Sequence, residues 1–462
     1  LVQFEALRDA NPGLVACSIT AYGKDGPWKD EPARDDLVLA RMGILGSMPG
    51  FRPAPVHVVH PLPSVGACVL AVLGIASALY ARQTTGVGRE VATTLMAGAL
   101  LYHPKVTGEK LDAHTFQTHP SGSAPFYSNY ECADGNWVQL GCVHAGFIAI
   151  AGRVLGITET LAEPRFGEGR APIDDAADAE LRDILADILR TRPYAEWAEA
   201  FETADVPYAP ARWTSESMED PQVQHNEMVL ELEDPVVGSI EQTGIGLKLE
   251  ETPGAVRGPR QDALPLNELP AQLPAAREPA PGAGSEAVQK QSPPLEGVRI
   301  LEITNLIAGP TGGRLLADLG ADVIKFEPLT GDMSRPIGRT YFYSVNFNKR
   351  SVSVDTRTDD GKEVVQRIAS SSDVLLANLR PHATERMGIG PAINPSLIEI
   401  HLTGYGFTGP YAKRPGIDPL AQAYMGMQRA QGGTENPPVF PAQLAPTDFT
   451  TGAVGAIGAV LC

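Results

Sequence analysis

The stretch HLTGYGFTGPYAKRPGIDPLAQAYMGM, residues 401–427, has a counterpart near the beginning of the chain. Residues 11–27 read NPGLVACSITAYGKDGP and residues 394–410 read NPSLIEIHLTGYGFTGP, so Asn394 follows Asn11 by 383 positions. The same separation extends to four later pairs: Pro32 with Pro415, Asp35 with Asp418, Met42 with Met425, and Gly43 with Gly426. A long register without gaps predicts two tandem copies of one domain.

We expect both copies to be incomplete. Copy one has 10 residues before Asn11, whereas copy two has 99 before Asn394 if it begins at Leu295. Equal repeats would place roughly 90 further residues ahead of copy one. Copy two has ten residues after Gly452, whereas copy one continues far beyond the matching Gly66. We interpret the sequence as a window across the junction of a longer tandem protein.

The composition is typical of a cytoplasmic globular protein. Hydrophobic residues make up 43% of the chain and charged residues 20%. The net charge of -18 argues against nucleic acid or an anionic membrane as partner. The five cysteines are scattered and form no C-x-x-C pair, which favours reduced thiols. His57 and His60 have H-x-x-H spacing but no third ligand, so we expect no metal site.

One apolar run resembles a membrane span. Residues 53–81 contain no Asp, Glu, Lys or Arg, and Ser64–Tyr80 is continuously small or apolar. The run is shorter than the roughly twenty residues that a span needs, and it is rich in alanine and glycine. We therefore predict a helix buried in a packed domain, covering about residues 64–82.

The order of elements predicts an α/β fold with Rossmann-like parallel-sheet large lobes and a small α+β lobe. Residues 1–262 are assigned to copy one, with a large-lobe portion at about 1–120 and the small lobe and return at about 121–262. In that lobe, Asp134 and Gly135 predict a hairpin turn. Residues 263–294 are rich in proline and alanine and are typical of a linker. Residues 295–462, copy two, alternate strands with helices, which indicates a parallel sheet.

A glycine-rich segment in copy two invites a dinucleotide interpretation. Gly309, Gly312 and Gly313 lie between a strand and a helix, and Glu327 ends the next strand. The spacing is not G-x-G-x-x-G, and Pro310 stands where a second glycine would admit a phosphate. The pattern therefore favours a nucleotide-binding topology used for another ligand.

Asp448 precedes the small-residue run GAVGAIGAV, which should be helical. Its position is typical of an ordinary helix cap. A carboxylate held by the N–H groups at a helix N-terminus also stays ionised and can serve as a positioned nucleophile. The residues by themselves leave both interpretations open.

The motifs LEGVRILEITNLIAGPTGGRLLADLGADVIKFE, NFNKRSVSVD, ERMGIG and TGYGFTGPY resemble the class III CoA-transferase family, of CaiB/BaiF type. This family includes formyl-CoA transferase, carnitine CoA-transferase and α-methylacyl-CoA racemase. The resemblance covers residues 295–462 and extends to copy one through ARQTTGVGREV and DGNWVQLG. It implies two lobes per subunit, and partner chains that interlock. Here it implies an intrachain pseudo-dimer of the two copies, with a homodimer as a further possibility.

The resemblance also implies a site. It assigns Asp448 as the covalent nucleophile of a CoA-transferase, with acyl-CoA and a carboxylic acid as substrates and no permanently bound cofactor. It implies CoA contacts from six residues: Val354, Arg357, Asn378, Leu379, Arg386 and Met387. Without the family, Arg357 and Arg386 would be interpreted as ordinary surface residues. Ile307 stands where formyl-CoA transferase has a glutamine, so formate and oxalate are not supported as substrates.

Copy one departs from the family pattern. Aligning Gly66 with Gly452 puts Leu62 at the position of Asp448, and no acidic residue lies between Asp36 and Glu90. We therefore predict that copy one has lost the nucleophile.

Two alternatives remain. A racemase of this family pairs its aspartate with a histidine at the position of Ile417; the nearest candidates here are Asp418 and Tyr405. A non-catalytic acyl-CoA-binding protein is the alternative from another class.

Overall fold

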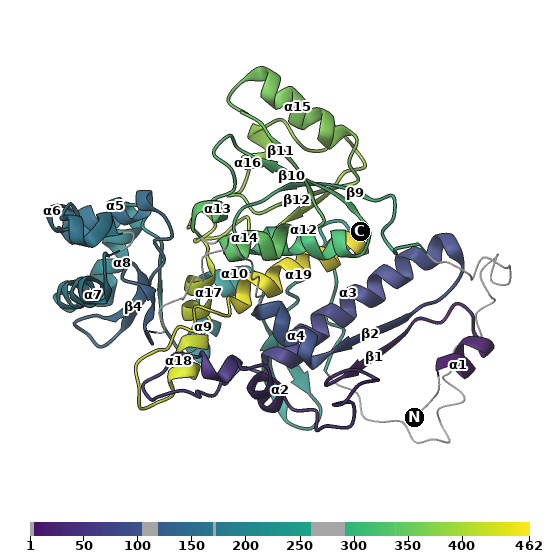
Figure 1. Ribbon diagram of the computed structural model, residues 1–462, viewed down its shortest axis with the longest axis horizontal. Helices are drawn as coiled ribbons and strands as arrows, with labels where there is room; N and C mark the ends of the chain where they lie inside the picture. The colour runs from purple at the N-terminus through teal and green to yellow at the C-terminus, as the bar shows by residue number, and fades with distance from the viewer. Residues whose placement is uncertain (1–3, 104–118, 170–171, 260–291, 338) are drawn as a thin grey trace.

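The computed structural model describes residues 4–103, 119–169, 172–259, 292–337 and 339–462 (Figure 1). Of the predicted linker 263–294, only the last three residues lie within these ranges. We refer to residues 4–259 as the N-terminal half and to residues 292–462 as the C-terminal half.

A five-stranded parallel sheet forms the centre of the C-terminal half, which confirms the predicted α/β class. Its strands stand in the order β11-β10-β9-β12-β13. The order reverses between β9 and β12, which is where open α/β sheets bind ligands. The three central strands are mostly buried, as strands covered on both faces require, whereas the edge strands β11 and β13 are more exposed. The strands are β9 (Arg299–Ile303), β10 (Asp322–Glu327), β11 (Arg350–Ser353), β12 (Val374–Ala377) and β13 (Ile398–His401).

Helices cover both faces of this sheet. Ile300 and Leu376 face α12 (Ala308–Asp318) and α19 (Pro446–Leu461), and share one apolar cluster with them. Leu301 and Leu375 face α15 (Asp359–Ser370) on the other side. The remaining helices of this half are α13 (Ser334–Ile337), α14 (Arg339–Asn346), α16 (Ala383–Arg386), α17 (Asp418–Tyr424) and α18 (Met427–Gly432).

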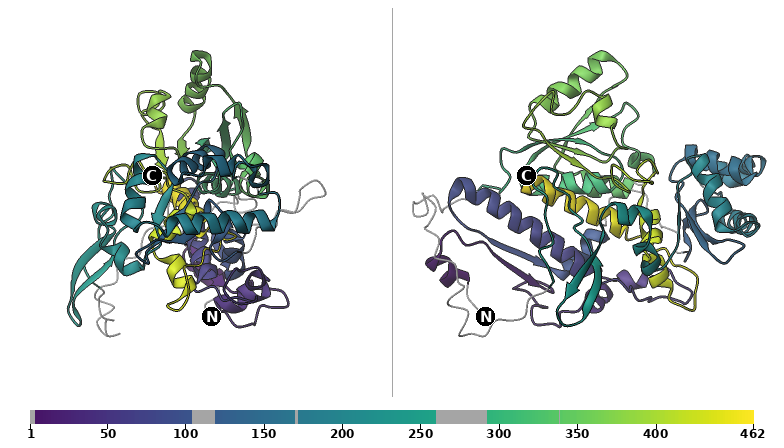
Figure 2. Two further views of the ribbon diagram at one scale, coloured as in Figure 1. Left: turned by 90° about the vertical axis from the view of Figure 1, so that its left-hand side faces the viewer. Right: turned by 180° about the vertical axis from the view of Figure 1, so that it is seen from behind.

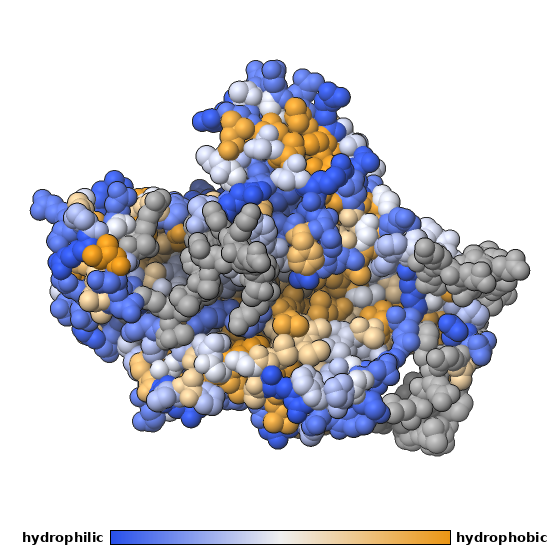
Figure 3. Space-filling view, in the orientation of Figure 1, coloured by the Kyte–Doolittle hydropathy of each residue, from blue (hydrophilic) through white to orange (hydrophobic). Residues whose placement is uncertain are grey.

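The N-terminal half begins with α1 (Phe4–Ala10) and a parallel pair, β1 (Ala16–Thr20) and β2 (Glu90–Thr94). Between them lie α2 (Asp35–Arg41), η1 (Ile44–Gly46) and α3 (Leu62–Thr85); α4 (Leu95–Tyr102) follows. α3 has 24 residues, so the expectation that this run is too short for a span was wrong. It nevertheless packs as a core helix, with 56% of its most apolar window buried. An apolar surface area lies over α3 and α4 (Figure 3).

The small lobe stands at one end of the molecule (Figure 2). It is an antiparallel sheet in the order β3-β4-β5-β6 with helices packed on it, so the predicted α+β character is present. The predicted hairpin joins β4 to β5, and Gly135 adopts the positive φ that its turn requires. The lobe comprises β3 (Gly122–Ala124), β4 (Tyr127–Glu131), β5 (Trp137–Leu140), α5 (Ala145–Leu155), α6 (Thr158–Leu161), η2 (Pro164–Gly169), α7 (Asp175–Leu189), α8 (Tyr194–Thr203) and β6 (Tyr208–Pro210).

A return segment leads back from the lobe. It contains α9 (Thr214–Met218), α10 (Pro221–His225), and a hairpin of β7 (Val229–Asp234) and β8 (Gly238–Thr243). Gln222 in α10 donates to the carbonyl oxygens of Tyr405 and Thr408, and it thereby ties this segment to the C-terminal half.

Equivalent elements recur at the separation of 383 residues. α2 begins at Asp35 and ends at Arg41, whereas α17 begins at Asp418 and ends at Tyr424. Three glycine pairs at this separation have similar positive φ angles: Gly23 with Gly406, Gly26 with Gly409, and Gly43 with Gly426. The repeated sequence therefore adopts the same local backbone in both halves.

The two halves share their cores. α19 lies between α12 of its own half and α3 of the other half (Figures 1 and 2). Leu73 of α3 is buried in the same cluster as Ala453 and Ala456 of α19. A second cluster joins Val38 and Leu39 to Phe449. Neither half therefore has a hydrophobic core of its own along α19.

Gly452 allows the close contact between α19 and α12. A methyl group on Gly452 would overlap the carbonyl oxygen of Ala308 and lie 2.8 Å from Thr311 Cβ. We expect Gly452→Ala to force the helices apart and to lower the free energy of unfolding by about 1–3 kcal/mol. Urea denaturation measures the change. Gly46→Ala is the matched control, because its methyl group would meet nothing within 4 Å, and a similar loss in both variants would contradict the packing argument.

Candidate active site

Asp448 lies in the first turn of α19, after Pro446 and Thr447. The preceding residue, Ala445, has a left-handed backbone, which turns the chain sharply into the helix. Protein atoms enclose Asp448 closely, yet part of its surface remains accessible to solvent. No hydrogen bond joins its carboxylate to another described residue. It is therefore an accessible carboxyl group that the fold itself does not use.

Asp418, at the start of α17, takes the hydrogen bonds at this end of α19. Its Oδ1 accepts from Thr447 N at 3.0 Å, from Thr447 Oγ1 at 2.6 Å and from Asp448 N at 3.4 Å. Its Oδ2 accepts from Gln422 Nε2 at 2.6 Å. The helix N-terminus is thus capped by a side chain from another helix. The cap interpretation of Asp448 was wrong, and so was the expectation that the helix N–H groups hold its carboxylate.

The two carboxyl groups perturb one another. Burial raises the pKa of Asp448 well above its usual value, and the nearby charge of Asp418 raises it further. Burial also raises the pKa of Asp418, although the hydrogen bonds from Thr447 and Gln422 oppose this rise. Two carboxyl groups so close cannot both ionise easily, so they titrate as a pair.

The charges of this pair act on two tyrosines, one from each half. Burial, followed by the charges of Asp418 and Asp448, raises the pKa of Tyr127 and of Tyr341, so both phenols stay protonated. Tyr341 is in α14, and its ring centroid lies 6.5 Å from that of Phe449. Tyr127 is the first residue of β4 in the small lobe. No spacing rule pointed to either residue, because the contacts form between segments far apart in sequence.

The six residues proposed for CoA follow strands or helices at the carboxyl edge of the sheet. Val354 comes after β11, Asn378 and Leu379 come after β12, and Met387 is the C-cap that follows α16. The apolar three, Val354, Leu379 and Met387, pack against one cluster. Asn378 lies at the reversal of strand order, where it bonds the backbone of Asn305 in both directions at 2.8 Å.

The two arginines of the set are exposed and are not part of that cluster. Arg357 pairs with Asp355, with Nη2 and Oδ2 2.8 Å apart. The hydrogen bond to Asp355 is the main cause that raises the pKa of the Arg357 guanidinium, and the charge of Asp355 adds to it. Arg386 lies at the end of α16. Both guanidinium groups can reach an anion only at the surface of this edge.

The glycines of residues 309–313 serve packing. α12 already begins at Ala308, so they lie inside the helix and not in a phosphate-binding turn. A methyl group on Gly313 would overlap the carboxylate of Glu302, and one on Gly312 would lie 2.8 Å from the Gly452 carbonyl oxygen. Glu327, the acidic residue that a dinucleotide interpretation would assign to a ribose, accepts from Arg335 Nε at 2.7 Å and Ser351 Oγ at 2.6 Å. These contacts agree with the sequence analysis, which favoured another ligand over a dinucleotide.

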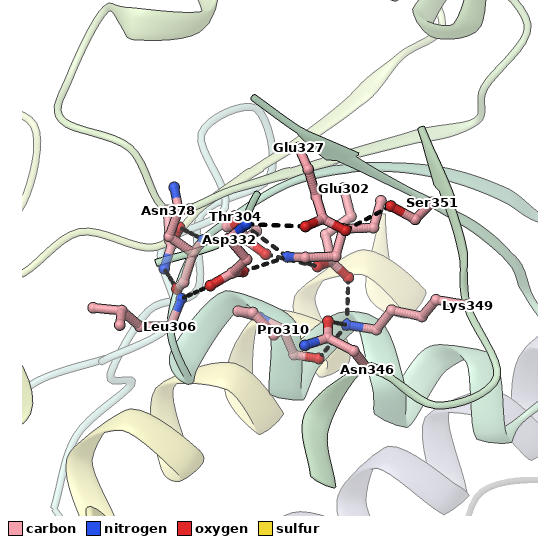
Figure 4. A network of polar contacts seen from close by, with 12 residues as sticks. Glu302, Thr304, Leu306, Pro310, Glu327, Asp332, Asn346, Lys349, Ser351 and Asn378 are labelled. Atoms are coloured by element: carbon pink, nitrogen blue, oxygen red, sulfur yellow. Dashed lines mark hydrogen bonds and ion pairs between the residues drawn. The ribbon is translucent and has the colours of Figure 1, made fainter. Parts of the chain in front are cut away.

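A buried charge network supports the sheet edge beneath these elements (Figure 4). Glu302 binds Lys325 at 3.1 Å and Lys349 at 2.8 Å, and Lys325 binds Asp332 at 2.9 Å. Burial lowers the pKa of Lys349 to about 8 despite Glu302. Asp332 also accepts from Leu306 N at 3.3 Å. The network therefore holds the loop that carries Ile307 toward α19.

The N-terminal half repeats the Asp418–Thr447 contact, but no aspartate follows it. Asp35 Oδ1 accepts from Ser64 N at 2.6 Å, and its Oδ2 accepts from Ser64 Oγ at 2.8 Å. Asp35 and Ser64 each stand 383 positions before Asp418 and Thr447. The residue after Ser64 is Val65, so Val65 corresponds to Asp448. The alignment that put Leu62 at this position was wrong by three residues.

Of the proton-transfer candidates, only Asp418 lies beside Asp448. Ile417 supplies the backbone cap of α17 and packs against Gly141. Tyr405 is buried in a cluster with Tyr411 and Tyr424, at ring-centroid distances of 6.1 and 5.8 Å. In the sequence analysis, Ile417 stands where a racemase has its histidine, and Tyr405 is a nearby candidate for proton transfer. Both statements concern chemistry and stay predictions. Within the described residues, no group of three or more potential metal ligands is found.

Comparison with known proteins finds a matching family and related proteins. The model of the family described as CoA-transferase family III matches residues 2–262 and 295–462. CoA-transferase/lyase DddD of Marinomonas sp. (strain MWYL1) is 27% identical over 533 residues, covering 100% of this chain and 62% of that protein. Succinyl-CoA:glutarate CoA-transferase of Mus musculus is 42% identical over 182 residues, covering 36% of this chain and 42% of that protein. The chain thus spans less than two thirds of the length of these curated relatives.

A solved structure is similar over a comparable part of the chain. The crystal structure of a hypothetical protein (Rv3272) from Mycobacterium tuberculosis is 40% identical and covers 36% of this chain and 49% of that one, with a TM-score of 0.34.

Replacing Asp418 should change the titration of Asp448. Asp418→Asn keeps an oxygen for Thr447 but removes the neighbouring negative charge, so the pKa of Asp448 should fall by roughly one unit or more. A water-soluble carbodiimide, which reacts with protonated carboxyl groups, followed by mass spectrometry, measures the pH at which Asp448 loses its reactivity. That pH should be lower in Asp418→Asn and unchanged in the matched control Asp35→Asn. Superimposable profiles for wild type and Asp418→Asn would contradict the pairing of the two carboxyl groups.

Proposed function

The chain belongs to CoA-transferase family III, and from that membership we propose that it moves CoA from an acyl-CoA to a carboxylic acid through covalent intermediates on Asp448. One observation carries the proposal. Asp448 is accessible, its carboxylate makes no hydrogen bond to a described residue, and it sits on a helix that a different carboxylate caps. A carboxylate with no structural task is available as a nucleophile.

The reaction divides into balanced steps. An Asp448 oxygen attacks the thioester carbonyl carbon, the C–S bond breaks, and CoA leaves as a thiolate, giving a mixed anhydride. The thiolate attacks the Asp448 carbonyl of the anhydride, which releases the donor acid and leaves an aspartyl-CoA thioester. The acceptor carboxylate attacks the carbonyl carbon of that thioester, the C–S bond breaks, and a second mixed anhydride forms as the CoA thiolate leaves. The thiolate then attacks the acceptor carbonyl of this anhydride, which gives the new acyl-CoA and frees the Asp448 carboxylate. Each step exchanges one acyl bond for another, so no redox partner is needed.

CoA binding is proposed at the carboxyl edge of the sheet. Val354, Leu379 and Met387 would contact the nucleotide through their shared apolar cluster. Arg357 and Arg386 are exposed at this edge and suit phosphate groups, because a guanidinium binds phosphate oxygens in pairs. Asn378 would present its backbone at the reversal of strand order.

We further propose that the halves are tandem copies that pair as a pseudo-dimer, with activity only in copy two. The recurrence of α2 and α17 at 383 residues, the matched Asp35–Ser64 and Asp418–Thr447 contacts, and the shared core support this proposal. Val65 at the nucleophile position cannot form an acyl bond. Copy one would then act as a structural partner.

Hydroxylamine should trap the intermediate on Asp448. In the intact protein incubated with an acyl-CoA and hydroxylamine, mass spectrometry should find a hydroxamate at Asp448 alone, because only an activated acyl carboxylate reacts. Asp448→Ala should lose both the hydroxamate and CoA transfer, by at least about 10³-fold in rate.

Asp36→Ala is the control for this experiment, since Asp36 is an exposed carboxylate that pairs with Arg34. Transfer that survives in Asp448→Ala would contradict the role of Asp448. A protein that binds acyl-CoA but forms no hydroxamate would be the non-catalytic alternative.

The racemase alternative has one observation in its favour, because Asp418 supplies a second carboxyl group beside Asp448. Racemisation needs one group to remove the α-proton and another to return it on the opposite face. Asp418 is already held by Thr447 and Gln422, and Ile417 cannot transfer a proton.

We therefore expect no exchange of the α-hydrogen. Incubation of a 2-methylacyl-CoA in deuterated water, without an acceptor acid, should leave the α position free of deuterium over many transfer turnovers. Deuterium entering at the turnover rate would make the protein a racemase.

A further inference from the structure

The small lobe of the N-terminal half packs directly on the segment that leads into α19. Phe440 N donates to the Pro120 carbonyl oxygen at 2.9 Å, and Asn129 Nδ2 donates to the Pro438 carbonyl oxygen at 3.2 Å. The rings of Tyr127 and Phe440 lie 5.7 Å apart, centroid to centroid. The small lobe is therefore held against a segment that ends eight residues before Asp448, and its strand β5 packs on α17, which begins at Asp418.

Tyr127 differs from the other tyrosine of the same strand. Tyr130 is buried, and its hydroxyl donates to the Pro125 carbonyl oxygen at 2.6 Å. Tyr127 keeps some exposed surface, and its hydroxyl has no hydrogen bond to a described residue. The charges of Asp418 and Asp448 act on the Tyr127 phenol and, with burial, raise its pKa, so the hydroxyl stays a donor. A phenol that packs on the segment leading into α19, and on which both carboxyl charges act, has a clear use if an acyl group binds there.

We propose that Tyr127 is a catalytic residue that the silent half supplies to the site of Asp448. Its hydroxyl would donate a hydrogen bond to the carbonyl oxygen of the acyl group under attack. This inference rests on the function proposed above. It adds to that function a stabilising group from the opposite half of the chain, which the nucleophile assignment alone does not contain.

The role can be followed through the first step. As Asp448 forms its bond to the thioester carbon, the carbonyl electron pair moves onto oxygen, and this oxyanion accepts the hydrogen bond from Tyr127. No proton is transferred; the oxyanion re-forms the carbonyl when the C–S bond breaks and CoA leaves as a thiolate. A donor that binds the oxyanion more strongly than the carbonyl lowers the barrier.

Tyr341 is less suited to this task. Its hydroxyl already faces the Gln443 carbonyl oxygen, at 3.4 Å, and its ring packs near Phe449 in the shared core. It forms part of the wall that holds α19. Tyr127 therefore remains the phenol whose donor is free to meet a substrate.

Tyr127→Phe in the intact protein tests the inference, because it removes the hydroxyl and keeps the ring against Phe440. The probe is the acyl-CoA that gives hydroxamate with the wild type. We expect kcat and the rate of hydroxamate formation at Asp448 to fall by about 10²-fold, with KM for the acyl-CoA changed less than about threefold. Tyr130→Phe is the matched control on the same strand and should keep the wild-type kcat.

The outcomes separate this inference from the proposed function. Hydroxamate at Asp448 with an unchanged rate in Tyr127→Phe would overturn the role of Tyr127 and leave the nucleophile in place. An equal loss in Tyr130→Phe would also overturn it, because a disturbed strand would then explain both variants. No hydroxamate in the wild type would overturn both proposals. If Tyr127→Phe misfolds, 3-fluorotyrosine can replace Tyr127, because it keeps the hydroxyl but makes it more acidic. The fall of kcat at alkaline pH should then occur at a lower pH than in the wild type.

Discussion

The contact between the backbones of α12 and α19 is the constraint on which the site depends. The two helices approach at Gly312 and Gly452 more closely than side chains would allow. Because α19 is buried along most of its length by small residues, it can lie against α12, α3 and the sheet at once. Asp448 then has a fixed position relative to the sheet edge. Larger residues in this helix would move the carboxylate away from this edge.

The C-terminal half encloses two groups of ionisable side chains, and only one of them contains both acidic and basic residues. Glu302 and Asp332 are buried with Lys325 and Lys349, so each charge has a partner and the group supports the loop before α12. Asp418 and Asp448 are enclosed together without a cation among their described contacts. The first arrangement serves the fold. In the second arrangement, the Asp448 carboxyl group has no hydrogen-bond partner among the described residues. Groups with perturbed pKa values often lie at functional sites.

Much of this arrangement could be predicted from sequence, and the exceptions have physical causes. Strand runs such as VLLA, residues 374–377, identify a buried parallel sheet because every position is apolar. Asp448 was found only through a family resemblance, since its neighbours in sequence indicate no more than a helix start. The role of Asp418 was missed because a cap supplied by another helix leaves no local spacing. Tyr127 was missed for the same reason, since the small lobe and α19 meet only in the folded chain.

The error at Leu62 is of another kind. It came from matching Gly66 to Gly452, but these glycines relieve contacts with different neighbours: Gly98 in one half and α12 in the other. Because such glycines only make room for a neighbouring backbone, their positions can differ between two corresponding helices. The Asp–hydroxyl contact cannot shift in this way, because both its backbone and side-chain bonds fix the register.

The shared core also means that α3 is synthesised long before the helix that covers part of it. α3 ends at Thr85, but α19, which covers part of it, begins only at Pro446, about 360 residues later. At a synthesis rate of 5–20 residues per second, the apolar side of α3 would wait about 20 to 70 s for its partner after leaving the ribosome. Contacts so distant in sequence close slowly. The apolar side of α3 therefore stays without this partner until α19 has been synthesised.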